Sequence, residues 1–294
     1  MKVSILIVSK NRKEDLFKTL TIIDSLIDKS QVEVLVFLDG CTDSSEEFVK
    51  ELEWIRWFVS NKSIGASAAR HKIYPLGNGE ILIGLDDDAH PLNKDFINLT
   101  ETLFQENSNV GVLAFEEVKG IFANDIDAFE GSEKVKKEFL CSEFIGCGFA
   151  IRKSVYMSIN GFPVWIDIYG EESCVSIEVL ANKYDILYTN RVKINHRVNK
   201  EQRKLNKQNY FRFEKQLKNS TYYFLVYYPF PLFNILKLYW HNFKKYALKD
   251  LECFKIYFKT VFVVLVNSPK ILRYRNPVDK TLIVKMRELA ALKF

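Results

Sequence analysis

Three consecutive aspartates, Asp86, Asp87 and Asp88, are the side chains of this sequence best suited to binding a cation. They follow the apolar run 81–85, which predicts a strand, and three carboxylates there repel one another unless a cation or protonation relieves the charge. Asp86 and Asp88 would share one face of an extended segment. Such oxygen ligands are typical of Mg²⁺ or Mn²⁺ sites that also bind substrate phosphates. The alternative is an acidic turn that only caps a helix beginning near Asn93.

The segments around the aspartates alternate between strand and helix patterns. Apolar runs predict strands at 3–8, 32–38, 55–59, 81–85 and 110–115. Amphipathic spacing and N-cap residues predict helices between them, at 13–26, 42–53, 65–74 and 93–106. This alternation predicts an α/β protein with an open, mostly parallel sheet and helices on its faces.

The carboxyl ends of the predicted strands select the candidate site residues, because ligands of such sheets bind beyond these ends. Four segments follow the strands: Ser9–Arg12, Asp39–Asp43, Ser60–Gly65 and Asp86–His90. Each of them carries polar or acidic side chains, so all four are candidates for one ligand site.

The pattern changes after about residue 117. Residues 117–170 predict an irregular connector that contains Gly, Asp and Phe, and the next segments predict a helix at 171–181 and a short strand at 185–189. Further helical spacing extends from about 200 to 228 and from about 249 to 266. The last third of the chain is therefore expected to be mostly helical.

The composition excludes several classes of protein. Apolar residues make up 48% of the 294 and aromatic residues 14%, which excludes an intrinsically disordered chain. The five cysteines are scattered and lack CxxC pairing, so we expect a reducing compartment rather than a disulfide framework. No secretory signal is expected. The longest uncharged stretch, 219–236, contains Pro229 and Pro231 and does not predict a membrane-spanning helix.

Charge is divided unevenly along the chain. Residues 199–294 contain 20 Lys and Arg against 6 Asp and Glu, whereas residues 1–198 contain 22 against 31. The basic segment also holds 20 of the 41 aromatic residues. Amphipathic helices of this composition lie in membrane interfaces, with cations toward anionic lipid. The alternatives are a small helical domain with an aromatic core and, with less support, a nucleic-acid-binding region.

Four segments together resemble glycosyltransferase family 2. They are VSILIVSKNR at 3–12, VFLDGCTD at 36–43, NKSIGASAAR at 61–70 and LDDD at 85–88, which is similar to the family's DxD element. Their order and spacing are more specific than a lone DxD, and the resemblance covers about residues 1–198.

The resemblance implies a site for a nucleotide diphospho-sugar. Asp39 would accept a hydrogen bond from the base, Arg70 would pair with diphosphate oxygens, and Asp86 would face the ribose or the metal. Asp88 would bind Mn²⁺ or Mg²⁺ directly, and His196 would complete the metal site. A surface ion pair for Arg70 and a structural role for His196 are the alternatives. The implied donor-binding residues are Ser9, Asn11, Arg12, Asp39, Arg70, Asp86 and Asp87, and the implied metal ligands are Asp86, Asp88 and His196.

The resemblance also implies a catalytic base. The segment 169–173, Tyr-Gly-Glu-Glu-Ser, resembles the family's G-E-D motif, and Glu172 stands at the position of the catalytic aspartate. A carboxylate there would accept the proton of the acceptor hydroxyl, while Glu171 would orient it or contact the acceptor. Two acids that only stabilise the helix dipole are the alternative. The implied acceptor-side residues are Gly146, Cys147, Gly148 and Trp165, for which an ordinary turn is the alternative.

The resemblance implies a GT-A fold over residues 1–198, a Rossmann-like open mixed sheet flanked by helices, with a basic, aromatic-rich helical region over 199–294. It implies an inverting, metal-dependent glycosyltransferase that moves a sugar from a UDP- or dTDP-sugar to a saccharide or lipid-linked acceptor in cell-surface polysaccharide synthesis. We expect a cytoplasmic protein, peripheral on the inner face of the cell membrane, without a nucleic-acid partner. The alternatives are a non-catalytic sugar-nucleotide-binding module, a sugar nucleotidyltransferase and a phosphatase that uses the same acidic strand end.

Overall fold

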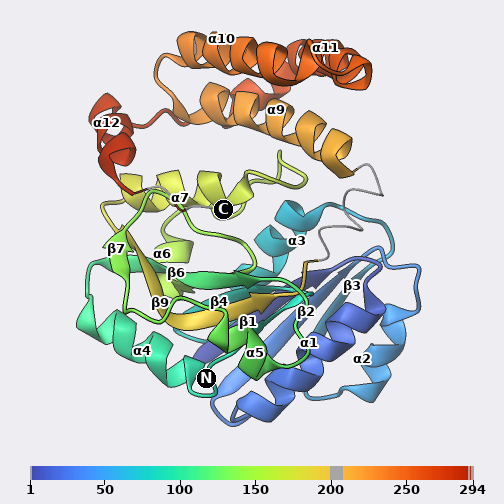
Figure 1. Cartoon of the computed structure of the whole chain (residues 1–294), viewed down its shortest axis with the longest axis vertical. Coiled ribbons are helices and arrows are strands. Elements are labelled where there is room, and N and C mark those ends of the chain that lie inside the picture. The colour runs from blue at the N-terminus through green and yellow to red at the C-terminus, as the bar shows by residue number, and fades with distance from the viewer. Residues whose placement is uncertain (1, 199–207, 291, 293–294) are drawn as a thin grey trace.

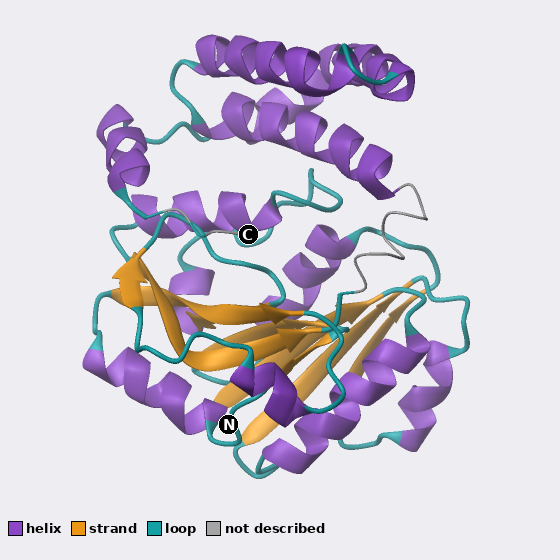
Figure 2. Cartoon of the chain, in the orientation of Figure 1, coloured by secondary structure: helices purple, strands orange, loops and turns teal. Residues whose placement is uncertain are grey.

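An α/β body and a layer of helices stacked on one side of it make up the chain (Figure 1). The computed structural model describes residues 2–198, 208–290 and 292. Figure 2 shows the strands of the body together in one sheet, with helices on both of its faces. The expected α/β class, with an open mixed sheet and a helical C-terminal region, is confirmed.

The first half of the sheet is parallel, as the sequence predicts. Strand β1 (Val3–Ser9) lies between β2 (Val32–Asp39) and β4 (Ile81–Asp86), and β3 (Arg56–Ser60) pairs with β2. Almost every side chain of β1 and β2 is buried. Burial on both faces explains why these strands appear in the sequence as continuous apolar runs.

The second half of the sheet is mixed. Strand β8 (Gly148–Arg152) runs antiparallel between β4 and β6 (Val110–Lys119), and β9 (Asp185–His196) runs parallel to β6. The order across the described strands is β3-β2-β1-β4-β8-β6-β9-β5, where β5 is Ala89–Pro91, and β7 (Glu138–Leu140) also pairs with β9.

The expectation of an irregular connector over 117–170 is wrong. This segment contains β7, the interior strand β8 and the short helices α5 (Asp125–Glu130) and α6 (Lys153–Met157). Strand β8 has only five residues, and its two partner strands come from distant parts of the sequence, so no local period marks it. Strand β9 likewise continues past the expected end at 189, because its polar side chains find buried hydrogen-bond partners.

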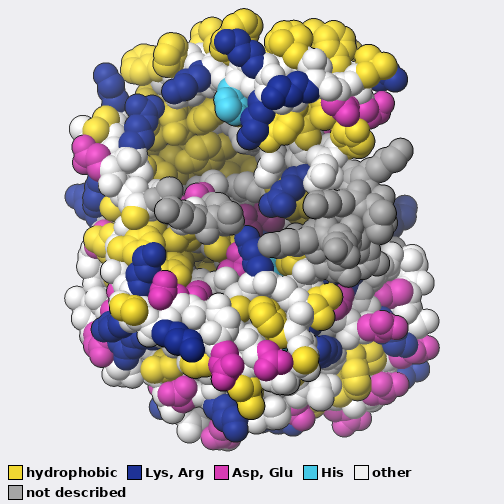
Figure 3. Space-filling view, in the orientation of Figure 1, with side chains coloured by type: hydrophobic (Ala, Val, Ile, Leu, Met, Phe, Trp, Pro, Cys, Tyr) yellow, Lys and Arg dark blue, Asp and Glu magenta, His cyan; other side chains and the backbone are white. Residues whose placement is uncertain are grey.

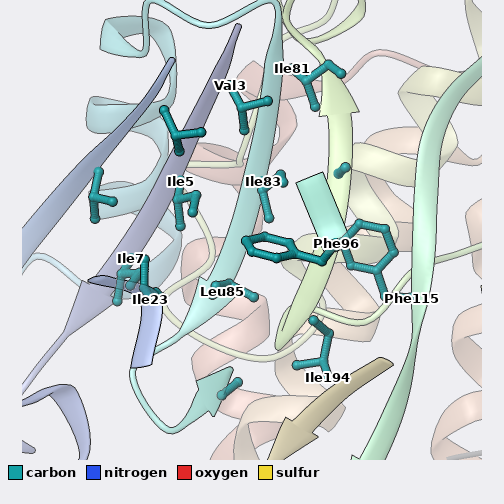
Figure 4. Close-up of a cluster of buried hydrophobic side chains, with 14 of the residues drawn as sticks. Val3, Ile5, Ile7, Ile23, Ile81, Ile83, Leu85, Phe96, Phe115 and Ile194 are labelled. Carbon is teal, nitrogen blue, oxygen red and sulfur yellow. The ribbon is translucent and has the colours of Figure 1, made fainter. Parts of the chain in front are cut away.

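Helices cover the two faces of the sheet and enclose two apolar clusters. On one face α1 (Lys13–Leu26), the short α2 (Phe48–Glu51) and α4 (Phe96–Glu106) pack against the strands. Figure 4 shows part of this cluster, in which side chains of β1 and β4 meet Ile23 of α1 and Phe96 of α4. On the other face lie α3 (Ala66–Ile73), α6 and α7 (Glu171–Ala181). The expected helix over 42–53 is shorter than predicted, since a 3₁₀ turn precedes α2.

The C-terminal region consists of α9 (Gln208–Tyr227), α10 (Pro231–Asn242), α11 (Leu251–Ile271) and α12 (Lys280–Glu288). Helix α9 packs between the body and the outer pair α10 and α11 (Figure 1). The predicted helix start near residue 200 lies outside the described residues. Helices α10 and α12 are not predicted, and Pro231 occupies the first turn of α10, where a missing N–H is tolerated.

The predicted division of the chain between residues 198 and 199 stays a prediction, because residues 199–207 lie outside the described residues. Within the described part of the chain, no helix combines the length and apolar character needed to cross a bilayer.

Candidate active site

Side chains from four separated segments meet: the carboxyl ends of β1 and β4, helix α3 and the start of α7. Ser9 donates a hydrogen bond to Asp87 over 2.8 Å, although 78 residues separate them. Arg70 links Asp86, at the end of β4, with Glu171, at the first turn of α7. The sheet order therefore gathers most of the candidate residues at one site, as the rule for α/β sheets predicts.

Asp86, Asp88 and His196 form a group suited to a divalent cation. One carboxylate oxygen of each aspartate and a ring nitrogen of His196 all lie within 4.8 Å of one another. The Oδ1 atom of Asp88 is buried and accepts no hydrogen bond, and His196 Nε2 lies 3.3 Å away. A buried carboxylate oxygen that lacks a hydrogen-bond donor is unfavourable, and a cation would compensate it. These three residues thus fit Mn²⁺ or Mg²⁺ in donor type and in arrangement.

Glu117, which the sequence analysis missed, fixes the orientation of His196. Nδ1 of His196 donates to Glu117 Oε1 over 2.5 Å, so Nε2 is the nitrogen that faces Asp88. Although burial acts against it, the nearby side chains of Asp88, Cys147 and Glu117 raise the pKa of His196 to about 12, so a metal would have to displace the Nε2 proton. A carboxylate on the far nitrogen is the usual second partner of a metal-binding histidine. Glu117 was hidden because the strand predicted at 110–115 continues to Lys119.

A second group of ligand atoms shares His196 and adds Glu117 and Cys147. Burial raises the pKa of the Cys147 thiol to about 12. A thiol is a soft ligand, whereas Mn²⁺ and Mg²⁺ prefer carboxylate oxygens. The group with Asp86 and Asp88 is therefore the stronger candidate for a metal.

Asp87 and Asp88 have opposite environments although they are neighbours. Burial raises the pKa of Asp87 to about 7, in spite of the Arg12 guanidinium 3.1 Å away. For Asp88, His196 and Arg12 outweigh the effect of burial and hold its pKa well below the usual range. Asp87 is also hydrogen-bonded to the buried Ser9. The hydrogen bond between Ser9 and Asp87 thus stabilises the end of β4. Asp88 is the aspartate of this pair that stays negatively charged at neutral pH.

Arg197 also supports the aspartates and was not singled out by the sequence. Its backbone N–H donates to the carbonyl of Asp88 over 2.9 Å, and its guanidinium donates to Thr19 Oγ1 over 2.6 Å. The same guanidinium donates to Nδ1 of His90, whose other ring nitrogen faces Asp125. His90 is thereby held among structural partners, away from the cation group.

Arg70 is the centre of an ion-pair network. Its guanidinium lies 2.6 Å from Asp86, 3.1 Å from Glu171 and 3.5 Å from Glu172, and its side chain is almost fully buried. The surface ion pair considered as an alternative is therefore not what forms. The planar guanidinium connects the cation group to the acids of α7 and offers several N–H donors to an oxyanion.

Glu171 and Glu172 differ in exposure. The side chain of Glu171 is 3% exposed and its Oε2 lacks a hydrogen-bond donor, whereas that of Glu172 is 22% exposed. Burial raises the pKa of both carboxyl groups, and the charge of Glu172 adds to the effect on Glu171. A Cβ on Gly146 would lie 2.1 Å from Glu172 Oε1, so only glycine leaves room for this carboxylate. Glu172 is thus the more accessible of the two acids.

The loop after β3 holds the carboxylate of Asp39, the last residue of β2. Its carboxylate accepts hydrogen bonds from the backbone N–H groups of Ile64 and Gly65, at 2.7 and 3.0 Å, and from the hydroxyl of Ser63. Asn11 accepts a hydrogen bond from the backbone of Thr42 over 2.6 Å. These contacts join the loops after β1, β2 and β3 into one rim, and a role of Asp39 or Asn11 in binding the base stays a prediction.

The four acceptor-side candidates have different surroundings: one borders the site, two are packed in the interior and one contacts the C-terminal region. Gly146 borders Glu172, Cys147 is buried beside His196, and a Cβ on Gly148 would meet Ile194 at 2.5 Å. Trp165 packs against Tyr227 and Tyr274 of the C-terminal region. Burial gives Cys147 and Gly148 packing roles, so of these four residues Gly146 and Trp165 remain candidates for acceptor contact.

Comparison with protein families identifies the chain. The family model described as Glycosyl transferase family 2 matches residues 4–159, just over half of the chain. The chain belongs to glycosyltransferase family 2. This match confirms the resemblance drawn from the four sequence segments, and it includes the aspartates, Arg70 and Gly146.

Several solved structures are similar to this family 2 chain in fold at low sequence identity. A mannosyltransferase from Pyrobaculum calidifontis, in complex with GDP-Man and Mn²⁺, is 14% identical with a TM-score of 0.58, over 97% of this chain and 83% of its own. TarS 1–349 from S. aureus is 15% identical with a TM-score of 0.51, over 65% of this chain and 60% of its own. GalNAc-T7 with UDP, GalNAc and Mn²⁺ is 13% identical with a TM-score of 0.53, and the match covers 67% of this chain and 44% of its own.

The chain thus spans less than two thirds of the length of TarS 1–349 and of GalNAc-T7. No curated protein sequence matches it. The structural matches establish a common GT-A architecture for this member of family 2.

Proposed function

We propose that this protein is an inverting, metal-dependent glycosyltransferase that uses a UDP- or dTDP-sugar as donor. The observation that carries the proposal is that a group of possible metal ligands and a pair of acids lie together at the end of β4. Asp86, Asp88 and His196 form a cation group in which one buried oxygen lacks a hydrogen-bond donor, and Arg70 connects this group to the acids of α7. Membership of family 2 supports glycosyl transfer over the nucleotidyltransferase and phosphatase alternatives.

Asp86, Asp88 and His196 would hold the cation, and Glu117 would keep His196 Nε2 directed at it. A bound Mn²⁺ or Mg²⁺ would offset the charge on the departing nucleoside diphosphate. Several solved structures with this fold are complexes with UDP, UDP-GlcNAc or GDP-Man, and two of them also contain Mn²⁺. These ligands support a nucleotide-sugar donor for the present chain.

Glu172 would act as the general base. In an inverting transfer the acceptor hydroxyl attacks the anomeric carbon opposite the leaving group, and one carboxylate takes its proton. Glu172 is the more exposed of the two acids and borders Gly146, while Glu171 is buried behind it against Arg70. Arg70 would contact diphosphate oxygens through N–H groups now directed at Asp86 and Glu171.

The acceptor in this proposal is a saccharide or lipid-linked saccharide of cell-surface polysaccharide synthesis. The basic, aromatic C-terminal region supports a lipid-linked acceptor, because such residues interact with membrane interfaces. A cytoplasmic location is supported by the five cysteines, all of which are free thiols in the structure. The protein would then act at the inner face of the cell membrane.

Titration calorimetry with UDP, dTDP and GDP, each with Mn²⁺, Mg²⁺ or EDTA, tests the proposal. We expect UDP or dTDP to bind more tightly with the metal, and Asp88→Asn to remove this enhancement while leaving the metal-free affinity unchanged. The matched control is Asp127→Asn, which changes an exposed aspartate of α5. Equal nucleotide binding with and without metal would overturn the proposed cation site, and binding without sugar transfer to any acceptor would favour the non-catalytic module.

A further inference from the structure

The outer helices α10 and α11 leave an unusually apolar surface in water. Ten large apolar side chains in these helices, in the turn between them and at the N-cap of α10 are each between 60% and 75% exposed. Along each helix, consecutive members are one, three, four or eleven residues apart, which places them on one face. The ten residues, here called the outer apolar face, are Phe230, Leu232, Phe233, Leu236, Trp240, Leu248, Leu251, Phe262, Leu265 and Val266.

The outer apolar face is surrounded by positive charge. Between residues 230 and 272 the chain has seven lysines and two acids, Asp250 and Glu252. Asp250 caps α11 through the backbone N–H of Cys253, and Glu252 lies 3.7 Å from Lys255. Figure 3 shows yellow apolar side chains with dark blue lysines and arginines among them over the outer helices. Lys244 also lies 4.4 Å from the centroid of the Trp240 ring.

A hollow beside α10 has the same mixed character. This cavity of about 530 Å³ is lined by aromatic rings of α9 and α10, including Phe224, Tyr228 and Phe233. Lys237, His241 and Arg287 contribute basic groups to its lining. Figure 3 shows it as a yellow-walled depression beneath the outer helices. An apolar wall beside cationic groups suits an amphiphile with an anionic head.

We propose that the outer apolar face docks this protein onto a bilayer that contains anionic phospholipid, with the cavity beside α10 accepting lipid at its edge. Apolar side chains would enter the interface, and the lysines would lie at the level of the lipid phosphates. A second copy of the chain is the less favourable occupant, since two such faces carry like charge and would repel each other. The docking does not depend on sugar transfer.

The docked layer is tied firmly to the catalytic segment. Asp167 pairs with Lys215 and Lys218 of α9, and Asn219 donates to the backbone carbonyl of Ile168 over 2.7 Å. Farther along α9, Tyr227 donates to Glu178 of α7 over 2.6 Å. The segment held in this way leads directly into Glu171 and Glu172. Membrane contact would therefore set the orientation of the active site relative to the bilayer.

Vesicle flotation with the full chain tests the docking. Wild-type protein is expected to float with vesicles of phosphatidylcholine plus phosphatidylglycerol, to float poorly with phosphatidylcholine alone, and to lose binding at high salt. Trp240→Ser combined with Phe262→Ser should weaken binding at least about tenfold, because two exposed apolar side chains would no longer insert. The matched control is Ile126→Ser with Val135→Ser, which changes two equally exposed apolar residues of the body.

The electrostatic part is tested by Lys244→Glu with Lys245→Glu, against Lys136→Glu on the body as control. Only the first pair should reduce flotation with anionic vesicles, by at least about tenfold. Because all these residues are exposed, melting curves should show that each variant folds. Failure of the wild type to float, or equal flotation of test and control variants, would overturn the proposal. So would light scattering that shows a dimer which Trp240→Ser with Phe262→Ser dissociates, since the face would then hold a second copy.

Discussion

Replacing the buried Glu171 with glutamine is expected to stabilise the folded protein at neutral and alkaline pH. Glu171 lies against Glu172 and Arg70, and one of its carboxylate oxygens has no hydrogen-bond donor. Glutamine has nearly the same shape and cannot ionise. Arg70 would keep Asp86 and Glu172 as partners, so the substitution leaves no isolated buried cation.

The magnitude follows from the pKa of Glu171. Burial, followed by the charge of Glu172, raises this pKa from 4.5 to about 8. Between these values the folded state holds a proton that the unfolded chain releases, so the free energy of unfolding falls as pH rises from about 4.5 to about 8. The difference between 8 and 4.5, at about 1.4 kcal/mol per pKa step, corresponds to at most about 5 kcal/mol. Because glutamine does not ionise, the free energy of unfolding of Glu171→Gln should not decrease in this way between pH 4.5 and 8.

Urea unfolding at several pH values between 5 and 9, in EDTA, measures the effect. The variant and the wild type should have similar stability near pH 5, and the variant should gain steadily until about pH 8. Glu130→Gln, an exposed residue of α5, should follow the wild type at every pH. Parallel stability curves for Glu171→Gln and the wild type would refute the reasoning, because they would show that Glu171 ionises in the folded state at its ordinary pH.

Three further substitutions test other parts of the site. Glu172→Gln should leave donor binding intact and lower turnover by about 10²–10⁴, the range for a lost general base, and unchanged turnover in steady-state assays would move the base elsewhere. Glu117→Gln should weaken Mn²⁺ affinity by about 10–100-fold in calorimetry, because His196 loses its orienting carboxylate, and an unchanged affinity would show that Glu117 does not orient a metal-binding His196. Tyr227→Phe should lower the free energy of unfolding by about 1–3 kcal/mol, since the buried Glu178 carboxylate loses a donor, and chemical denaturation that shows no change would contradict this contact.

Local pattern was sufficient for the first half of the sheet and for α1 and α7. The helices expected at 13–26 and 171–181 have these bounds in the structure. Strands buried on both faces and amphipathic helices carry their structure in short-range spacing, which a single sequence displays. The aspartates and Arg70 could be singled out for the same reason, since strand ends and helix starts are local features.

Local spacing could not predict contacts between segments that are far apart in the sequence. Strand β8 is short and gains its place from β4 and β6, and α10 begins at a proline that the sequence alone marks as a break. Glu117 became visible only when β6 and β9 set it beside His196.

The sequence by itself determined the family, the strand ends and the types of side chain available for chemistry, because these depend on residues near one another in the chain. Tertiary structure alone decided which of them meet. It directed Arg70 toward both Asp86 and Glu171, left Asp88 Oδ1 without a donor and exposed one face of α10 and α11. Burial and charge at these positions arise from elements that are far apart in sequence, so only the packed fold specifies them.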